Sequence, residues 1–431
     1  DPLNRVTTYS YDLNENLSSM VDAELNTTSY VYDERDLLFT VSDANTPVGV
    51  TTYDYDINGN LLQVRDANSN ATTYAYDLFD RLDTTTYADL SFSDYDYDKN
   101  SNMIRHTTPS TESIEYDYDE LDRMVAKRFP LSASLDTTYD YDLGSRMTSA
   151  SNAASTISFG YDALNRVTSN AQTLNSLAHA LSYQYDDVGN RTQLVYPSGK
   201  TLDYTYDAHN RLDIIKQGGV DFVDYDYDPL DRRVQKTFLA TSNEQQATYS
   251  YDIANQLLDL TNTTLPSTTI SQYAYPVYDL VGNRTQLDRT LGTTPTQTIN
   301  YNYNTIYELT SVTGAQTNSY AYDNVANRTS ADGTTYTPNN LNQYTDVGGQ
   351  THLYGNNGNL TSDGNNTYTY DAQNRLTTAA NTSHNSSYTY DAFNRRVSKT
   401  VDGSVTYFVY DGDQVIAEYD GSGTLLAEYI T

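Results

Sequence analysis

The chain has 431 residues, a net charge of −32 at neutral pH and an isoelectric point near 4.2. This balance argues against nucleic acid and anionic membrane surfaces as partners, because both attract lysine and arginine. Hydrophobic residues make up only 37%, and tyrosine alone supplies 44 positions, so a thick core of the usual kind is not expected.

The predicted elements are short strands in pairs, which recur along the whole chain. Each unit is anchored on the tyrosine of a Tyr-Asp dipeptide or its nearest equivalent, and most anchors lie 20 to 24 residues apart. Repeats at such a period indicate an array of similar units. The anchors are Tyr11, Tyr32, Tyr55, Tyr76, Tyr97, Tyr118, Tyr141, Tyr161, Tyr185, Tyr206, Tyr227, Tyr251, Tyr278, Tyr303, Tyr322, Tyr370, Tyr390 and Tyr410, with degenerate units near Tyr336 and Tyr354.

One unit, "YAYDLFDRL" at residues 74–82, shows the pattern. Tyr74 and Tyr76 are two apart and should share one face of a strand. The aspartate after them is expected to open a turn by accepting hydrogen bonds from backbone amides. A residue that tolerates a left-handed backbone follows three positions later. Those residues are Gly59, Asp80, Asn165, Gly189, Asn210, Gly282, Asn374 and Asn394.

A lone hairpin is marginal in water, so successive hairpins should pair edge to edge and bury one another's tyrosines. The predicted fold is therefore all-β, with tandem hairpins in one long curved or spiralling antiparallel sheet that forms a hollow shell or tube. We expect about 40 strands, since each of about 20 units supplies two. The rings of each Y-x-Y pair should stack on neighbouring units, and arginine should stack on the rings or pair with the turn aspartate.

The stretch "SDYDYDKNSN", residues 93–102, resembles the start of a calcium loop. Its sixth position from Asp94 is Lys99 where an EF-hand has glycine, and its twelfth is Arg105 where an EF-hand has glutamate. We therefore expect Asp94, Asp96 and Asp98 to form a solvated strand face and no specific metal site.

The motifs "YDALNRVT" (161–168), "YDDVGNRTQ" (185–193) and "YDAQNRL" (370–376) resemble the YD repeats of the Rhs family, which includes polymorphic toxins, wall-associated toxins, shell subunits of insecticidal toxin complexes and teneurins. Residues 388–430 look like the Rhs-associated core. The resemblance implies tandem YD repeats over 1–369, degenerate near 336–369, and final repeats with the start of the core over 370–431. In that family the sheet spirals into a cocoon around a C-terminal toxin, which a self-cleaving aspartyl segment releases.

The chain departs from the family at both ends. It begins within a motif at Asp1 and stops before the segment where the family's cleavage aspartates lie. We therefore expect a piece of a longer protein, with its own absent N- and C-terminal segments as partners.

We find no catalytic, cofactor-binding or metal-ligating motif, and predict that the chain is not an enzyme and needs no cofactor. "PSGKT" at 197–201 lacks the earlier glycine of a phosphate loop. Five histidines lack metal-ligand spacing and are interpreted as surface residues: His106, His179, His209, His352 and His384. Eleven N-x-S/T sequons are better explained by chance than by glycosylation; they are Asn16, Asn26, Asn70, Asn190, Asn262, Asn283, Asn327, Asn359, Asn365, Asn381 and Asn385.

Three functions remain open. The first is a shell or scaffold wall around another polypeptide, in a secreted or surface protein of bacteria. The second is an extracellular filament or stalk built by self-association, and the third is a carbohydrate-binding surface that uses tyrosines as platforms. No membrane insertion is expected, because no run approaches the ~18 apolar residues of a membrane span.

Overall fold

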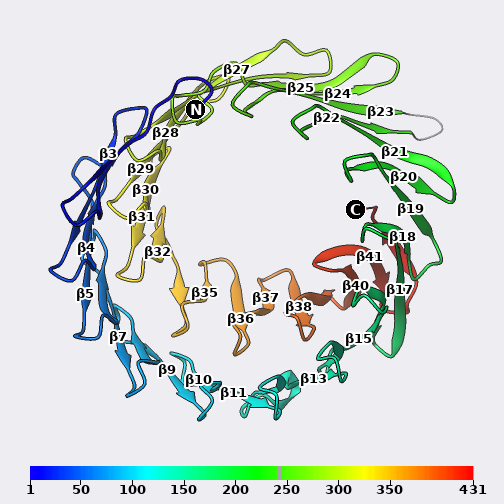
Figure 1. Ribbon diagram of the computed structural model, residues 1–431, viewed down its shortest axis with the longest axis horizontal. Coiled ribbons are helices and arrows are strands. Elements are labelled where there is room, and N and C mark those ends of the chain that lie inside the picture. Colours follow the sequence, from blue (N-terminus) through cyan, green and yellow to red (C-terminus); the bar gives the residue numbers. More distant parts are fainter. Residues whose placement is uncertain (240–243, 431) are drawn as a thin grey trace.

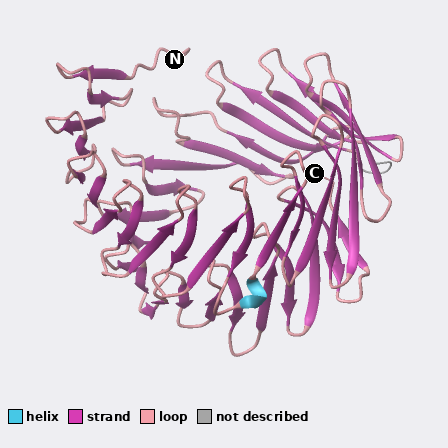
Figure 2. Ribbon diagram, turned by 60° about the horizontal axis from the view of Figure 1, so that its bottom comes forward, coloured by secondary structure: helices cyan, strands magenta, loops and turns pink. Residues whose placement is uncertain are grey.

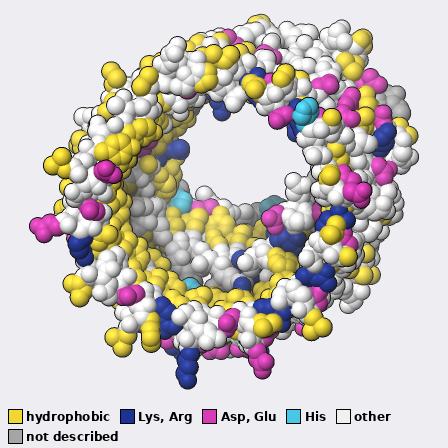
Figure 3. All heavy atoms as spheres, viewed as in Figure 1, with side chains coloured by type: hydrophobic (Ala, Val, Ile, Leu, Met, Phe, Trp, Pro, Cys, Tyr) yellow, Lys and Arg dark blue, Asp and Glu magenta, His cyan; other side chains and the backbone are white. Residues whose placement is uncertain are grey.

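The computed structural model describes residues 1–239 and 244–430. Within them the chain is a wall of short strands wound into a spiral around an open lumen (Figure 1 and Figure 3). The described residues form 42 strands and one short 3-10 turn, η1 (Ala133–Leu135), so the prediction of an all-β fold with about 40 strands is confirmed. No helix in the described ranges is long and apolar enough to cross a membrane.

The strands follow one another in chain order. Those of the first half are β1 (Thr8–Tyr11), β2 (Leu17–Val21), β3 (Thr27–Tyr32), β4 (Leu38–Ser42), β5 (Val50–Tyr55), β6 (Leu61–Arg65), β7 (Ala71–Tyr76), β8 (Leu82–Thr86), β9 (Phe92–Tyr97), β10 (Met103–Thr107), β11 (Ser113–Tyr118), β12 (Met124–Arg128), β13 (Thr137–Tyr141), β14 (Met147–Ser151), β15 (Ser155–Tyr161), β16 (Val167–Leu174), β17 (Leu177–Tyr185), β18 (Arg191–Val195), β19 (Thr201–Tyr206), β20 (Leu212–Gln217) and β21 (Val220–Tyr227). Those of the second half are β22 (Arg233–Phe238), β23 (Gln245–Tyr251), β24 (Leu257–Thr264), β25 (Thr268–Ala274), β26 (Gln286–Leu291), β27 (Gln297–Tyr303), β28 (Leu309–Gly314), β29 (Asn318–Tyr322), β30 (Arg328–Ala331), β31 (Thr334–Pro338), β32 (Tyr344–Val347), β33 (Gln350–Thr351), β34 (Leu353–Tyr354), β35 (Leu360–Ser362), β36 (Thr367–Tyr370), β37 (Leu376–Ala380), β38 (Asn385–Tyr390), β39 (Arg396–Val401), β40 (Ser404–Asp411), β41 (Gln414–Asp420) and β42 (Leu425–Glu428).

The sheet is an antiparallel meander, in which each strand pairs with the next along the chain. Two sheets result, one of 33 strands from β1 to β33 and one of 9 strands from β34 to β42, and they are divided at His352. Figure 2 shows the strands side by side around the ring, with turns at both edges of the wall. Threonine and tyrosine suit this arrangement because both have high strand propensity.

Most units carry a bulge at the second tyrosine of the Y-x-Y pair. In the pair β7–β8, Ala75 lies opposite Thr84 but Tyr76 lies opposite Leu82, so Asp83 has no partner across the ladder. The same shift occurs at Tyr97 in the next unit. Because a bulge bends its strand and increases the local twist, a bulge in successive units curves the wall steadily in one sense.

The spiral closes on itself after most of the chain, and its second turn lies along the first. In Figure 1 the yellow strands β28–β32 lie beside the blue strands β3–β5, and the red strands β40 and β41 lie beside β15 and β17. Hydrogen bonds accordingly join residues that are between 220 and 285 positions apart.

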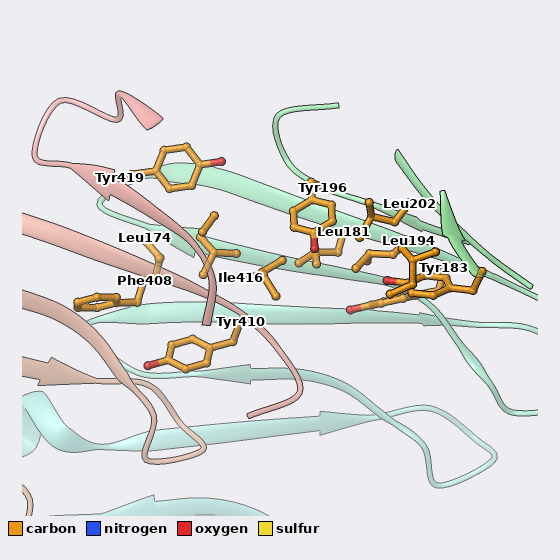
Figure 4. Close-up of a cluster of buried hydrophobic side chains, with 14 of the residues drawn as sticks. Leu174, Leu181, Tyr183, Leu194, Tyr196, Leu202, Phe408, Tyr410, Ile416 and Tyr419 are labelled. Carbon is orange, nitrogen blue, oxygen red and sulfur yellow. The ribbon is translucent and has the colours of Figure 1, made fainter. Parts of the chain in front are cut away.

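The largest hydrophobic core lies where these two turns meet. Strands β39–β41 pack on β16–β21, and Leu194, Leu202, Val409 and Ile416 are fully buried there (Figure 4). Elsewhere the wall is a single sheet whose hydrophobic side chains, tyrosine included, gather on the inner surface that Figure 3 shows. A thick core is thus confined to the contact between turns.

The Y-x-Y pairs lie as predicted, but their stacking partner differs. Tyr74 and Tyr76 are partly buried while Ala75 between them is exposed, which fits two rings on one face. Stacking of tyrosine on tyrosine from neighbouring units was also expected. Where the preceding described unit carries arginine in its turn, the second ring in most cases lies under that arginine instead, as under Arg81, whose guanidinium carbon is 4.6 Å from the centre of the Tyr97 ring.

Candidate functional site: the turn ladder and the seam

In most units an aspartate follows the first strand and builds the turn after it. Asp77 Oδ1 accepts hydrogen bonds from the backbone N–H groups of Phe79 and Arg81, at 2.8 and 3.1 Å. Asp80 has φ 58°, in the left-handed region. The eight residues predicted for that conformation all have positive φ, between 58° and 100°. The prediction of the turn is therefore confirmed.

In units with arginine after the left-handed residue, its side chain links the turn to the next unit. Arg81 Nε donates to Asp77 Oδ2 at 2.7 Å, and its Nη1 donates to the backbone oxygen of Asp98 at 2.9 Å. The Tyr97 hydroxyl in turn donates to the backbone oxygen of Leu82 at 2.9 Å. The side-chain hydrogen bond from Arg81 and the backbone N–H groups hold the pKa of Asp77 below its usual range. These groups are thus used as structural links between units.

Asparagine replaces arginine in several units and makes the same links. Asn102 Nδ2 donates to Asp98 Oδ2 at 3.0 Å and to Asp122 Oδ1 of the next unit at 2.8 Å. The side chains of five predicted sequons bond the turn aspartate in this way, namely Asn16, Asn70, Asn190, Asn283 and Asn327. Their occurrence follows from the repeat, and their amide groups are already engaged.

The aspartates of residues 93–102 do not all share one strand face. Asp94 and Asp96 lie on β9, but Asp98 follows the strand and accepts hydrogen bonds from the backbone N–H groups of Asn100 and Asn102, both at 2.8 Å. The expectation was wrong for Asp98 because this residue is the turn aspartate of its unit. Asp96 pairs with Arg105 on β10. Among the described residues, no group of three acidic, histidine or cysteine side chains is placed to hold a metal ion.

The seam is the contact between the two turns of the spiral, and its parts match unit by unit. In the second spiral turn, the β-turns that begin at the turn aspartate or its equivalent lie at the seam. They contact the first spiral turn at the other edge of its wall, where the β-turns without the Y-x-Y motif lie. Asn340 Nδ2 donates to the backbone oxygen of Ala88 at 2.8 Å, and Lys127 Nζ donates to Gln373 Oε1 at 2.9 Å. Sequence reasoning did not identify these residues.

At two docked turns the seam buries a small side chain at the position after the turn aspartate. Ala372 and Ala392 occupy it in two docked turns and are each 5% exposed. In turns of the first spiral turn, the same position holds Leu13, Leu78 and Leu143, which are 103%, 100% and 107% exposed. Ala163 is exposed at the same position in a free turn, so the burial of Ala372 and Ala392 comes from the contact between spiral turns and not from the residue type.

Buried polar contacts lock strand β40 onto the first spiral turn. The Gln172 side chain, 1% exposed, donates to the backbone oxygen of Tyr410 and accepts from its N–H at 3.0 Å. Asp411 accepts from the Tyr183 hydroxyl at 2.9 Å and pairs with Arg191. Burial, and secondarily the Asp411 charge, raises the pKa of Tyr183.

The histidines have structural surroundings that differ from the surface interpretation in two cases. His179 is 6% exposed and lies 4.2 Å from the Tyr419 ring across the seam, so the surface prediction was wrong for it. His106 is half-buried and stacks on Tyr95 at 4.8 Å. His209 lies exposed in a turn, and His384 Nδ1 is 2.7 Å from Asp402.

"PSGKT" at residues 197–201 forms a turn of the wall, in which Gly199 has φ 87°.

Comparison with protein families matches two parts of the chain to one shell domain. Residues 118–220 and 276–430 match the family described as teneurin YD-shell, and residues 55–90 match the family described as RHS repeat. No curated protein matches the chain.

Solved structures share the fold at low sequence identity. The crystal structure of TcdB2-TccC3-Cdc42 has a TM-score of 0.79 at 14% identity, over 99% of this chain and 28% of that chain. A Photorhabdus luminescens Tc holotoxin pore with a mutant TccC3 gives 0.79 at 14%, over 97% and 27%. TcdB2-TccC3 gives 0.76 at 14%, over 99% and 31%. The chain spans less than a third of each of these proteins.

Proposed function

This chain belongs to the teneurin YD-shell family and is a YD-repeat wall, and from that we propose that it encloses a polypeptide in its lumen. The observation that carries the proposal is the seam, which fixes the second turn of the spiral onto the first and makes a continuous wall around a hollow (Figure 3). Similarity of fold to a chain of the Photorhabdus luminescens Tc holotoxin supports a toxin as the enclosed polypeptide.

The proposed role is architectural and without catalysis. The carboxylates that repeat along the chain are bound in turns, as Asp77 is by Phe79 and Arg81, and a carboxylate held in this way serves the fold. We place the protein outside the cell or on the surface of a bacterium. We assign residues 370–431 to the final repeats and the start of the Rhs-associated core.

The position of the C-terminal end gives a direct test. Figure 1 places this end inside the ring, close to β18 and β19. A flexible tail fused after Thr431 should start in the lumen and be cleaved by a bulky protease more slowly than the same tail fused before Asp1. Equal cleavage rates for the two tails would contradict enclosure, and electron micrographs of axially repeating tubes with an empty lumen would support the filament instead.

A further inference from the structure

The seam contains a cavity of about 330 Å³ between β9 and β10 of the first spiral turn and three β-turns of the second, at residues 339–343, 355–359 and 371–375. Residues of the second turn that line it include Leu341, Gln343 and Asn357. This volume is at the lower end of the about 300–1,000 Å³ of pockets for small ligands.

An aromatic pair forms part of the cavity wall. Tyr95 and His106 lie opposite each other on β9 and β10, and their rings are stacked at 4.8 Å with 5° between the planes. Tyr87 also lines the cavity. Flat rings of this kind carry electron-rich faces, which attract the slightly positive C–H groups of a ligand.

Hydrogen-bonding groups stand beside these rings. His106 Nε2 is buried and has no hydrogen-bond partner among the residues that the structure describes, which is costly for a polar atom unless a ligand or water supplies one. Asn357 uses its amide oxygen to accept from the Ser110 N–H at 2.8 Å, and Asn374 uses its own to accept from Asn359 Nδ2 at 2.8 Å. The NH₂ group of each amide is then free to donate to a ligand.

The cavity is lined without a single charged side chain among the described residues, in a protein with a net charge of −32. Three other cavities along the seam each include charged residues. These are Glu24 and Asp279 in one, Arg65 in another, and Glu112 and Asp371 in the third. Burial also lowers the pKa of His106, which favours the neutral ring over the charged one. A phosphate, sulfate or carboxylate ligand would find no counter-charge here.

We propose that this cavity binds a neutral saccharide, with one face of the sugar on a ring face of the Tyr95–His106 pair that the stacking leaves open, and its hydroxyl groups bonded to His106 Nε2 and to the amides of Asn357 and Asn374. A sugar suits this lining because it presents C–H groups on one face and hydroxyl groups, which both donate and accept, around its edge. The proposal is independent of enclosure in the lumen. It assigns to one place in the seam the carbohydrate binding that the sequence left open as an alternative.

Saturation-transfer NMR on the intact chain tests it with a panel of methyl glycosides of glucose, galactose, mannose and N-acetylglucosamine and their disaccharides. A sugar of about a dozen non-hydrogen atoms should bind with a dissociation constant of roughly 1 mM. Glucuronic acid and glucose phosphate should bind at least tenfold more weakly. A glycan array shows whether the ligand is a free sugar or the end of a longer glycan. The protein should be retained on the array only if the cavity accepts the end of a longer glycan.

Matched variants identify the site. Tyr95→Ala should weaken binding at least tenfold, whereas Tyr74→Ala, the equivalent tyrosine of the preceding unit, should leave it unchanged. Asn374→Gly removes an amide and keeps a residue suited to its φ of 61°, so it tests the site even where Tyr95→Ala misfolds. Absence of saturable binding to every neutral sugar, or binding that survives both Tyr95→Ala and Asn374→Gly, would overturn the proposal.

Discussion

Replacing one buried alanine of the seam should show how much the contact between spiral turns contributes to stability. Ala392 follows the turn aspartate Asp391, is 5% exposed, and packs with Tyr139 and Ala150 of the first spiral turn. Ala392→Leu would place three more carbon atoms in this contact. The turn itself tolerates leucine, because Leu78 occupies the same position in a free turn and is 100% exposed.

The expected cost follows from this packing. Extra methylene groups in a filled site cost about 1–3 kcal/mol, whereas substitutions on an exposed surface are usually within about 0.5 kcal/mol. Ala163 offers the matched control, since "YDALNR" at 161–166 repeats "YDAFNR" at 390–395 and Ala163 is exposed. Ala392→Leu should therefore lose about 1–3 kcal/mol of unfolding free energy, and Ala163→Leu almost none.

Urea unfolding followed by tyrosine fluorescence measures both variants, and hydrogen exchange of residues 385–428 shows where the wall loosens. Exchange should rise in β38–β41 for Ala392→Leu alone. Equal stability and equal exchange in the two variants would refute the claim that the seam is a packed contact.

Three further predictions concern single groups. Gln172→Leu should leave the buried N–H and C=O of Tyr410 unpaired, at about 1–3 kcal/mol each, and faster exchange of the Tyr410 amide would reveal it; an unchanged rate would contradict it. The backbone hydrogen bond from Arg211 helps to lower the pKa of Asp207 to about 2. The ionised Asp207 carboxylate therefore stabilises the fold fully above its usual pKa of about 3.9, and this stabilisation is lost as the pH falls through about 2. Acid titration of Asp207→Asn should show a weaker loss of stability across that window than the parent, and identical curves would argue against the shift. Calorimetry should find no stoichiometric micromolar calcium site, and such a site abolished by Asp96→Asn would contradict the paired role of Asp96.

The turn could be predicted from sequence because its contacts are local. Asp77 bonds backbone groups within four residues of itself, and Asp80 has the residue type that its backbone requires. The arginine contacts could also be predicted from sequence, since Arg81 contacts the next unit along the chain.

The seam could not be predicted in the same way. Gln172 meets Tyr410 across 238 positions, and which unit lies opposite which depends on curvature summed over all the bulges between them. A small error in the bend of each hairpin would shift the partner by a whole unit. The same reason explains why His179 was assigned to the surface, because its burial comes from Tyr419 of the other spiral turn.

The residues that meet at the seam are far apart in sequence, so the strands on its two sides are synthesised at different times. Each hairpin can form as soon as its roughly 20 residues have left the ribosome, because its contacts are local. Strands β17–β20 are then complete while β40 and β41 have not yet been made, and Leu194 and Leu202 face water until those strands arrive. An apolar strip that is exposed during translation can associate with other chains. A ribosome stalled before β40 should therefore carry an aggregation-prone nascent chain, and one stalled after β41 a chain that is protected.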